Sequence, residues 1–355
     1  MINFKTYLAV LVMSAAVSYL LTPLVRRLAF RWKAIDQPDA RKVHKQPMPR
    51  LGGIAVFAGF CAPWALFYLL NNRVSATFQN YEKLFLALMI GAGLMLLLGV
   101  VDDIKGLNAK QKFSFQIMTA LAMYFGGYQI TLLSNPFGNS IALGWLALPV
   151  SILWIVGVTN AINLLDGIDG LATGITVCIA LSLAIINIIN DNIIVALLTL
   201  CLAGACLGFL PYNFSPAKIF LGDSGSLFIG LVLAGIGMLS LFKVTTAAIV
   251  IVPVVLFGIP LFDTTAVFFG RLMRGDPLFK ADKTHLHHRL LRLGLDHRQA
   301  SLLLYAVSAA LGGVAVYVNV NHTPRMVVIV SALVMVLAIC VLFVLRNPDK
   351  PKDNP

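Results

Sequence analysis

The sequence predicts an all-α, polytopic integral membrane protein: a bundle of about 11 transmembrane helices forming one membrane-embedded domain over residues 1–355. Only 12% of the residues are charged and 59% are hydrophobic, whereas ordinary soluble domains are about one quarter charged. Apolar windows of about 20 residues, enough to cross a hydrocarbon core of roughly 30 Å, recur along the whole chain. The motif-like polar stretches lie in the connections between these windows.

Eleven windows fit this description. The first is a retained span and not a signal peptide, because it lacks a basic amino-terminal region and a cleavage site, and Arg26 and Arg27 follow it directly. The ninth contains Pro253, Pro260 and Asp263, and this aspartate is either a polar packing residue or a support for a site. In chain order the windows cover residues 4–25, 52–70, 84–101, 113–130, 141–159, 171–189, 193–210, 226–242, 246–269, 301–320 and 326–345.

Positive charge divides the connections into two groups. Lysine and arginine concentrate in alternate connections, which the positive-inside rule places in the cytoplasm. We therefore expect the amino terminus outside, the carboxyl terminus in the cytoplasm, and cytoplasmic loops at about 26–51, 102–112, 160–170, 211–225 and 270–300. Topology and attraction to anionic lipid account for the net charge of +12, so no nucleic-acid partner is expected. The other connections hold only Lys5, Arg73, Lys83, Lys243 and Arg325.

The acidic residues favour the cytoplasmic side and are almost all aspartates. Only Glu82 and Asp191 fall on the outer side, and Glu82 is the single glutamate of the chain. A preference for the shorter carboxylate indicates tight local geometry. Asp102 and Asp103 follow the apolar run MLLLGVV, at a helix end where carboxylates oppose the macrodipole. Ionisable residues at membrane depth favour a functional role, with neutralisation by a divalent metal or by Lys105, Lys110 and Lys112.

The stretch NAINLLDGIDGL interrupts two apolar windows. Asn163, Asp166 and Asp169 are spaced by three, which would place them on one face of a helix. Gly167 and Gly170 argue instead for a broken or capped helix, in which the backbone approaches a ligand closely. A tight turn with a capping aspartate would explain one acid, but not two acids and two asparagines. We interpret the stretch as a contact for a base or a sugar.

The stretch FLGDSGS is a glycine-flanked loop before a helix. Such a loop presents amides to phosphate oxygens, while Asp223 is suited to a hard cation. Ser224 has no suitably placed base, so a nucleophilic serine is disfavoured. Asn213 and Lys218, upstream in PYNFSPAKIF, are expected in the same pocket, and Phe220 is assigned to substrate binding.

The stretch HLHHRLL places His285 and His288 on one helical face. A zinc site would need a third and a fourth ligand that local spacing does not supply. A basic loop facing a pyrophosphate is favoured because cationic residues surround the histidines: Lys280, Lys283, Arg289 and Arg292. Hard carboxylates, basic residues and a membrane together point to chemistry on a phosphorylated lipid, since phosphoryl transfer needs charge neutralisation and positioning above all.

The ordered motifs resemble the polyprenyl-phosphate N-acetylhexosamine-1-phosphate transferase family (glycosyltransferase family 4). The resemblance covers nearly the whole chain and rests on five stretches in family order: RKVHKQPMPRLGG, VDD, NAINLLDGIDGL, NFSPAKIFLGDSGS and HLHHRL. The HLHH form is similar to the WecA/TagO branch and not to MraY-type enzymes. The resemblance implies transfer of N-acetylglucosamine 1-phosphate from UDP-GlcNAc to undecaprenyl phosphate, with release of UMP, at the cytoplasmic face of the inner membrane.

The resemblance also implies Mg²⁺ or Mn²⁺ dependence and assigns roles to individual residues. Asp223 matches the metal aspartate, Asp102 and Asp103 match a catalytic acidic pair, and Lys112 matches a phosphate-contacting lysine. The residues that match positions near the uridine are Asn163, Asp166 and Asp169. The residues that match the loop near the sugar are His285, His287, His288 and Arg289.

Three alternatives remain open at this point. The same reaction with another UDP-N-acetylhexosamine or with UDP-MurNAc-pentapeptide would use the same motifs. A cation transporter would place acids within the spans and show an internal repeat, whereas here the acids gather at one face and no repeat is evident. A prenyl synthase is the third alternative because of the paired aspartates, but IKGL follows Asp103 in place of a DDxxD-type motif. A homodimer is compatible with the sequence.

Overall fold

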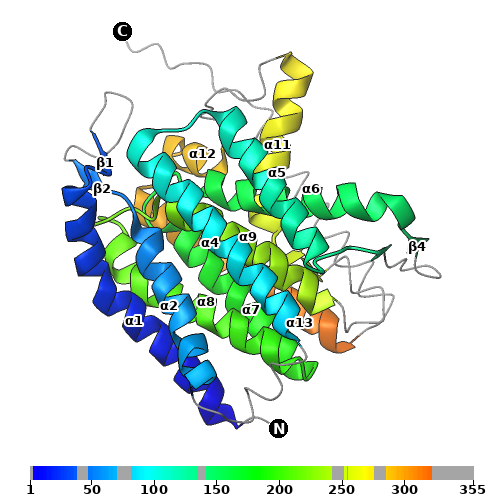
Figure 1. Cartoon of the computed structure of the whole chain (residues 1–355). Helices are drawn as coiled ribbons and strands as arrows, with labels where there is room; N and C mark the ends of the chain where they lie inside the picture. The colour runs from blue at the N-terminus through cyan, green and yellow to red at the C-terminus, as the bar shows by residue number, and fades with distance from the viewer. Residues whose placement is uncertain are drawn as a thin grey trace.

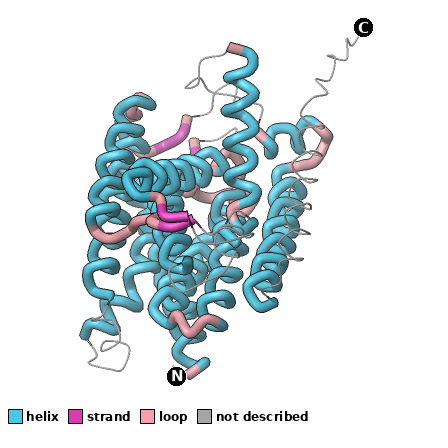
Figure 2. The backbone as a smooth tube through the Cα atoms, turned by 90° about the vertical axis from the view of Figure 1, so that its right-hand side faces the viewer, coloured by secondary structure: helices cyan, strands magenta, loops and turns pink. Residues whose placement is uncertain are grey.

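The computed structural model describes residues 3–37, 47–69, 81–133, 141–241, 252–253, 255–275 and 285–321. Within these residues the regular secondary structure is helical apart from two short strand pairs, with loops between the elements (Figure 2). The helices are α1 (Phe4–Arg31), α2 (Gly52–Leu69), α4 (Glu82–Lys105), α5 (Ala109–Phe125), α6 (Ala147–Leu165), α7 (Leu171–Ile189), α8 (Ile193–Asn213), α9 (Gly222–Leu241), α11 (Gly258–Arg274), α12 (Leu286–Arg292) and α13 (His297–Asn321), with the 3₁₀ helix η2 (Gly144–Leu146) before α6.

Among the described helices, seven are long and apolar enough to cross a membrane, which confirms a helical, multi-pass membrane protein. They are α1, α4, η2 with α6, α7, α8, α9 and α13. The remaining expected windows correspond to the shorter helices α2, α5 and α11 and to residues 326–345. That last window, the first part of window 246–269 and the carboxyl terminus lie outside the described residues.

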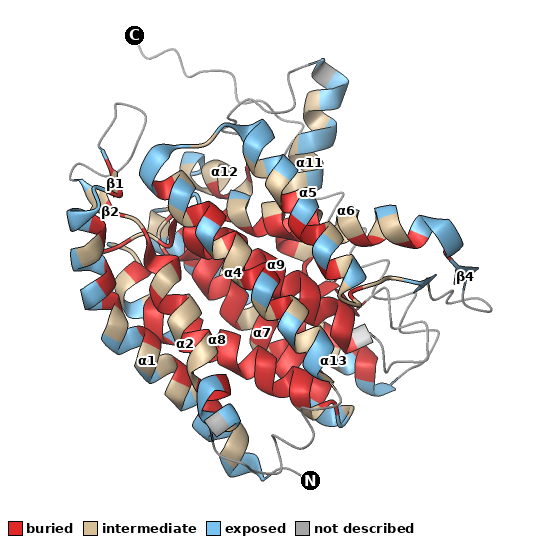
Figure 3. Cartoon of the chain, viewed as in Figure 1, coloured by how far each residue is buried: buried red, intermediate tan, exposed pale blue. Residues whose placement is uncertain are grey.

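The centre of the bundle is formed by α7, α8 and α9 (Figure 3). In the apolar windows of α8 and α9, 83% and 89% of the residues are buried, whereas in α1 the share is 28%. Around them, α1 and α2 pack against α8, while α4 and α6 pack against α9. Small residues permit these contacts: a side chain at Gly204 or Gly208 of α8 would overlap the backbone of α1, as is typical of membrane helix packing.

Several connections that carry motifs gather at one end of the bundle, the upper end in Figure 1. Here α1 continues into the antiparallel pair β1 (Ile35–Asp36) and β2 (Met48–Pro49), which leads into α2. The loop before α9 is fastened to this pair, because the Phe220 N–H donates to the Pro49 carbonyl (2.9 Å) and the N–H groups of Gly52 and Gly53 donate back to that loop. A second pair, β3 (Leu132–Leu133) and β4 (Ile141–Ala142), joins α5 to η2.

Candidate active site

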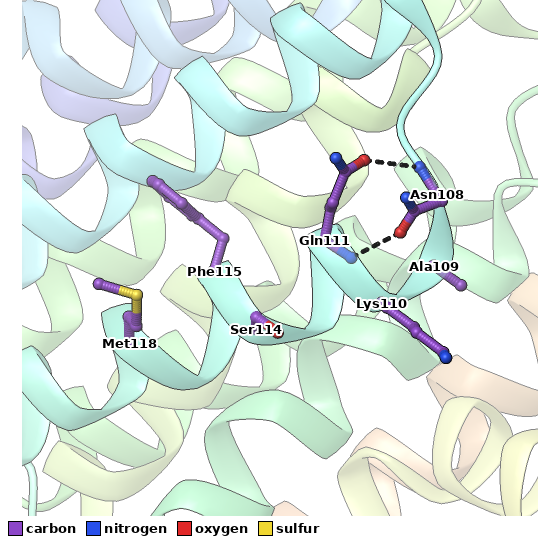
Figure 4. Close-up of a pocket in the computed structure, with 7 residues that line it drawn as sticks. All are labelled: Asn108, Ala109, Lys110, Gln111, Ser114, Phe115 and Met118. Atoms are coloured by element: carbon purple, nitrogen blue, oxygen red, sulfur yellow. Dashed lines mark hydrogen bonds between the residues drawn. The ribbon is translucent and has the colours of Figure 1, made fainter.

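The corner between α4 and α5 positions Asp102 and Lys112. Gly106 ends α4 with a positive φ of 67°, and the Asp102 carboxylate accepts the Leu107 N–H at 2.5 Å. A capping box starts α5: the Gln111 N–H donates to the Asn108 side chain, and the Gln111 side chain accepts the Asn108 N–H (Figure 4). Lys112 therefore lies in the first turn of α5, facing back toward the end of α4.

Lys112 joins two carboxylates that are 121 residues apart in the sequence. Its Nζ donates to Asp102 Oδ2 at 2.9 Å and to Asp223 Oδ2 at 2.7 Å. Burial by itself would lower the pKa of Lys112, but the negative charges of Asp223 and Asp102 outweigh it and raise the pKa, so the ammonium stays charged. The other Asp223 oxygen accepts the Asn163 amide at 3.0 Å, and that amide also donates to Ser226 (2.8 Å).

Asp103 holds the start of α9 instead of facing Lys112. Its two carboxylate oxygens accept the backbone N–H groups of Asp223 (3.0 Å) and Ser224 (3.1 Å), and the side chain is 8% exposed. The amino-terminal N–H groups of a helix have no partner within the helix, so an anion there is favourable. The Ser224 hydroxyl is buried and directed to the Leu221 carbonyl, in keeping with its rejection as a nucleophile.

The stretch NAINLLDGIDGL ends one helix and begins the next. α6 ends at Leu165 and α7 begins at Leu171, and Gly170 between them has a φ of +75°. The prediction that the helix is broken here is therefore confirmed, and the three residues do not share one face of a continuous helix. Asp169 accepts the Ala217 N–H at 3.0 Å, which ties the turn to the loop before α9. Burial, and then the negative charges of Asp223 and Asp103, raise the pKa of Asp166 well above its usual range.

The first turns of α13 hold the same turn from its other side. The Ser301 hydroxyl donates to the Asp169 carbonyl (3.2 Å) and the Tyr305 hydroxyl to the Gly170 carbonyl (2.6 Å). A side chain at Gly174 would overlap the Tyr305 ring, so glycine is needed where this ring crosses α7. No sequence pattern indicates a role for Ser301 or Tyr305, because both lie in an apolar membrane window.

Asn213 is used within the fold. Its amide donates to the Ile219 carbonyl (3.1 Å) and accepts the Thr173 hydroxyl (2.7 Å), and the residue is buried. The amide is thus bonded to α7 on one side and to the loop before α9 on the other. Asn213 and Phe220 both line the polar cleft described below.

The histidine segment is held by Asp263. One oxygen of this carboxylate lies 2.9 Å from His285 Nδ1 and the other accepts the Leu286 N–H at 2.7 Å. Asp263 was expected to be either a packing residue or a residue that supports a site, and these contacts show that it holds the histidine segment in place. His287 is buried with its ring against Gly167, and burial, followed by the neighbouring His288, lowers its pKa to about 3.

His288 and Arg289 lie on α12, half-buried, and His288 lines the cleft. Lys280 and Lys283 lie outside the described residues.

A polar cleft of about 550 Å³ brings together residues from all five motif loops. This volume is typical of sites for small organic ligands. Its wall includes Asp36 and Arg50, which form an ion pair across the β1–β2 pair, and His297 at the start of α13. Sequence reasoning gave these three no role, although opposite charges on either side of a short loop were a signal. The expected site residues in the wall are Asp103, Asp166, Asp169, Asn213, Phe220, Asp223 and His288.

A separate groove of about 680 Å³ lies on the surface of α5, where it is lined by residues between Asn108 and Met118 (Figure 4). Phe115 and Met118 make its floor apolar, and it has no lining residue in common with the polar cleft.

The carboxylates fit a hard divalent cation. Asp102 and Asp223 both direct an oxygen to the Lys112 ammonium, so they already share a cation. The described residues contain no group of three histidine, cysteine, aspartate or glutamate side chains suited to a metal. The pair Asp102 and Asp223 suits Mg²⁺, which takes one or two carboxylates and completes its shell with water and substrate phosphates. Within the same residues, His285 and His288 have no third zinc ligand.

Comparison with known proteins places the chain among membrane transferases. The model of glycosyl transferase family 4 matches residues 85–241. The chain is 40% identical to a probable undecaprenyl-phosphate N-acetylglucosaminyl 1-phosphate transferase of Bacillus subtilis (strain 168), over 81% of this chain and 78% of the relative. It is 33% identical to a decaprenyl-phosphate N-acetylglucosaminephosphotransferase of Mycolicibacterium smegmatis, over 96% and 89%. An undecaprenyl-phosphate alpha-N-acetylglucosaminyl 1-phosphate transferase of Escherichia coli (strain K12) is 27% identical, over 86% and 82%.

The fold and the site define a multi-pass membrane enzyme whose charged cleft lies at the helix ends. The chain belongs to glycosyl transferase family 4 and is a sugar-1-phosphate transferase.

Proposed function

We propose that the protein transfers N-acetylglucosamine 1-phosphate from UDP-GlcNAc to a polyprenyl phosphate, undecaprenyl phosphate in particular, as the first membrane step of a cell-envelope polysaccharide. The observation that carries this proposal is the Lys112 ammonium between Asp102 and Asp223, beside a cleft of nucleotide-sugar size. Two phosphorylated substrates bring several negative charges together, and a fixed cation there reduces their repulsion. The names of the relatives supply the sugar and the lipid class.

The reaction needs little covalent machinery from the protein. A phosphate oxygen of the lipid forms a bond to the β-phosphorus of the donor, the bond from that phosphorus to the bridging oxygen breaks, and UMP leaves with the electron pair. A phosphomonoester has a second pKa of about 6, so its dianion is plentiful at neutral pH. Asp102 orients the incoming phosphate or accepts its remaining proton, while Lys112 balances charge.

Asp103 acts one step away from the chemistry. By binding the first N–H groups of α9 it fixes the position of Asp223. A bound Mg²⁺ or Mn²⁺ would be held by Asp223 and Asp102 and would neutralise charge on the diphosphate.

In this proposal, the turn between α6 and α7 and the histidine segment bind the donor. Asp166 and Asp169 line the cleft together with Phe220, and His288 faces it from α12. We assign the uridine to the turn, with Asn163 holding Asp223 in place, and the sugar to His285, His287, His288 and Arg289. Replacement of Asp166 by Asn is expected to weaken use of UDP-GlcNAc far more than it disturbs folding. The raised pKa of Asp166 indicates that the folded protein stabilises its negative charge poorly, so removal of that charge should cost little stability.

We further propose that the chain crosses the inner membrane eleven times, with the amino terminus outside and the cleft in the cytoplasm. The concentration of lysine and arginine in the loops at the cleft end supports this orientation. A cysteine introduced at Lys105 should react with an impermeant maleimide in inverted vesicles and be protected in intact cells; the reverse pattern would overturn the orientation.

The decisive experiment is a panel of labelled donors with the purified full-length protein. UDP-GlcNAc, UDP-GalNAc and UDP-MurNAc-pentapeptide are each supplied with undecaprenyl or decaprenyl phosphate, with and without Mg²⁺. We expect lipid-linked label from UDP-GlcNAc and stoichiometric UMP. Label from the pentapeptide donor alone would overturn the assignment of the sugar. Cation flux in liposomes without any transfer would overturn the reaction itself.

A further inference from the structure

A second charged groove lies at the same end of the bundle, between α1 and α8. It has a volume of about 440 Å³ and is formed by the last turns of α1, the end of α8 and the following loop. Its basic residues are Arg26, Arg27 and Lys218, and Phe30 and Tyr212 supply aromatic walls. It shares no lining residue with the polar cleft.

Within the part of the chain that the structure describes, the cations of this groove have no acidic partner. The salt bridges among the described residues involve other cations, and none joins a carboxylate to Arg26, Arg27 or Lys218. The Arg26 guanidinium lies over the Phe30 ring, 6.0 Å from its centroid. Three cations held around one groove repel one another, and an anion between them would remove that repulsion.

The apolar surface beside the groove indicates what kind of anion fits. Leu24 and Leu20 lie about one and two turns before Arg27 on α1 and are 60% and 70% exposed. Tyr19 packs against Tyr212 with ring centroids 5.1 Å apart, so the apolar surface of α1 adjoins the aromatic wall of the groove. A ligand that contacts both surfaces has a phosphate at one end and hydrocarbon at the other, which is the chemistry of a membrane lipid.

We propose that Arg26, Arg27 and Lys218 form a binding site for the phosphate headgroup of an anionic phospholipid, whose acyl chains lie along Leu20 and Leu24 of α1. Arginine matches phosphate oxygens with two parallel N–H donors, and lysine adds a point charge. The negative potential of an anionic lipid surface attracts basic side chains at the ends of membrane spans.

The groove is connected to the polar cleft through one short segment. The Lys218 N–H donates to the Tyr212 carbonyl at 2.7 Å, and the adjacent Ala217 N–H donates to Asp169 at 3.0 Å. A lipid phosphate that bridges α1 to Lys218 therefore braces the loop that holds Asp169. Resting on the proposed function, this predicts a lower KM for the donor in anionic lipid.

The test measures lipid retention without any donor, so it is independent of transfer activity. The purified full-length protein is titrated in neutral detergent with palmitoyl-oleoyl phosphatidylglycerol or phosphatidylcholine, and bound lipid is counted by native mass spectrometry. The variant R27Q/K218Q is compared with K105Q/K110Q, which removes the same charge from exposed lysines at the same end of the bundle. The variant R27K/K218R keeps the charge and controls for folding.

We expect wild type and R27K/K218R to prefer phosphatidylglycerol. In R27Q/K218Q the affinity for phosphatidylglycerol should fall about 25-fold, from about fivefold for each cation, while K105Q/K110Q changes less than twofold. An equal loss in K105Q/K110Q would show general surface charge and overturn the site. Full competition by millimolar inorganic phosphate, or exclusive retention of added undecaprenyl phosphate, would overturn a phospholipid as the occupant.

Discussion

The variant Asp103→Asn tests whether Asp103 stabilises the fold or contacts the substrate. The two carboxylate oxygens accept the N–H groups of Asp223 and Ser224 at 3.0 and 3.1 Å, in a position that is 8% exposed. Asparagine offers one acceptor and one donor, so one buried N–H loses its partner and faces a second N–H. A hydrogen bond to a charged group contributes about 1.5–3 kcal/mol, and the charge at the helix start adds about 0.3–1 kcal/mol. We therefore expect Asp103→Asn to lower the free energy of unfolding by about 2–4 kcal/mol.

The matched control is Asp102→Asn, at the next position along the same helix. Its bond to Lys112 is partly solvated, so removal should cost about 1 kcal/mol of stability, whereas turnover should fall on the order of a hundredfold. Denaturant titration in mild detergent and the transfer assay measure both quantities. If Asp103→Asn unfolds at the wild-type denaturant concentration and loses one limb of its pH–rate profile, Asp103 takes part in the chemistry and the positioning role is refuted.

Three further changes test the site. In Lys112→Gln the two carboxylates lose their shared cation, so Mg²⁺ should raise Tm more than it does in wild type or in Lys110→Gln; equal shifts would argue against a metal at these carboxylates. Tyr305→Phe removes the hydrogen bond of 2.6 Å to the Gly170 carbonyl, and a loss of about 1 kcal/mol should raise the KM for UDP-GlcNAc about fivefold at nearly constant kcat; an unchanged KM would contradict a positioning role. His287 has a pKa of about 3 when folded, against 6.5 for an unperturbed histidine, so only the unfolded chain takes up this proton as pH falls below 6.5. Stability should drop by about 2 kcal/mol between pH 6.5 and 5 from this residue alone, and the slope should flatten in His287→Gln; parallel profiles would exclude a buried neutral ring.

The sequence predicts the helical, membrane-spanning fold well because hydrocarbon imposes a strict length and polarity on each span. The boundaries shift where a polar group outside the window extends the helix. The window at 113–130 becomes a helix that begins at Ala109, because a capping box forms at Asn108. The window at 226–242 becomes a helix that begins at Gly222, because Asp103 on another helix satisfies its first N–H groups. The first shift has a local signal, and the second has none.

The site was predictable in its composition but not in its division of labour. The ordered motifs identified the segments that form the site, and the cleft contains residues from each of them. Which residue faces the cleft depends on partners far away in the chain. Asn213 lines the cleft, but Thr173 and Ile219 bind its amide. His287 is buried against a glycine on another loop, while its neighbour His288 reaches the cleft.

The hydrogen bonds that the aspartates make explain why the chain contains a single glutamate. Asp102, Asp103, Asp169 and Asp263 each accept a backbone N–H, and three of them do so from a different loop or helix. A carboxylate on one methylene reaches a main-chain N–H with few rotamers to fix, whereas glutamate would place the same oxygens one bond farther out and lose more rotamer freedom on burial. The site is thus assembled by short acids that fasten loops to one another. Asp223, held by Lys112 and Asn163, stands at the point where those loops meet.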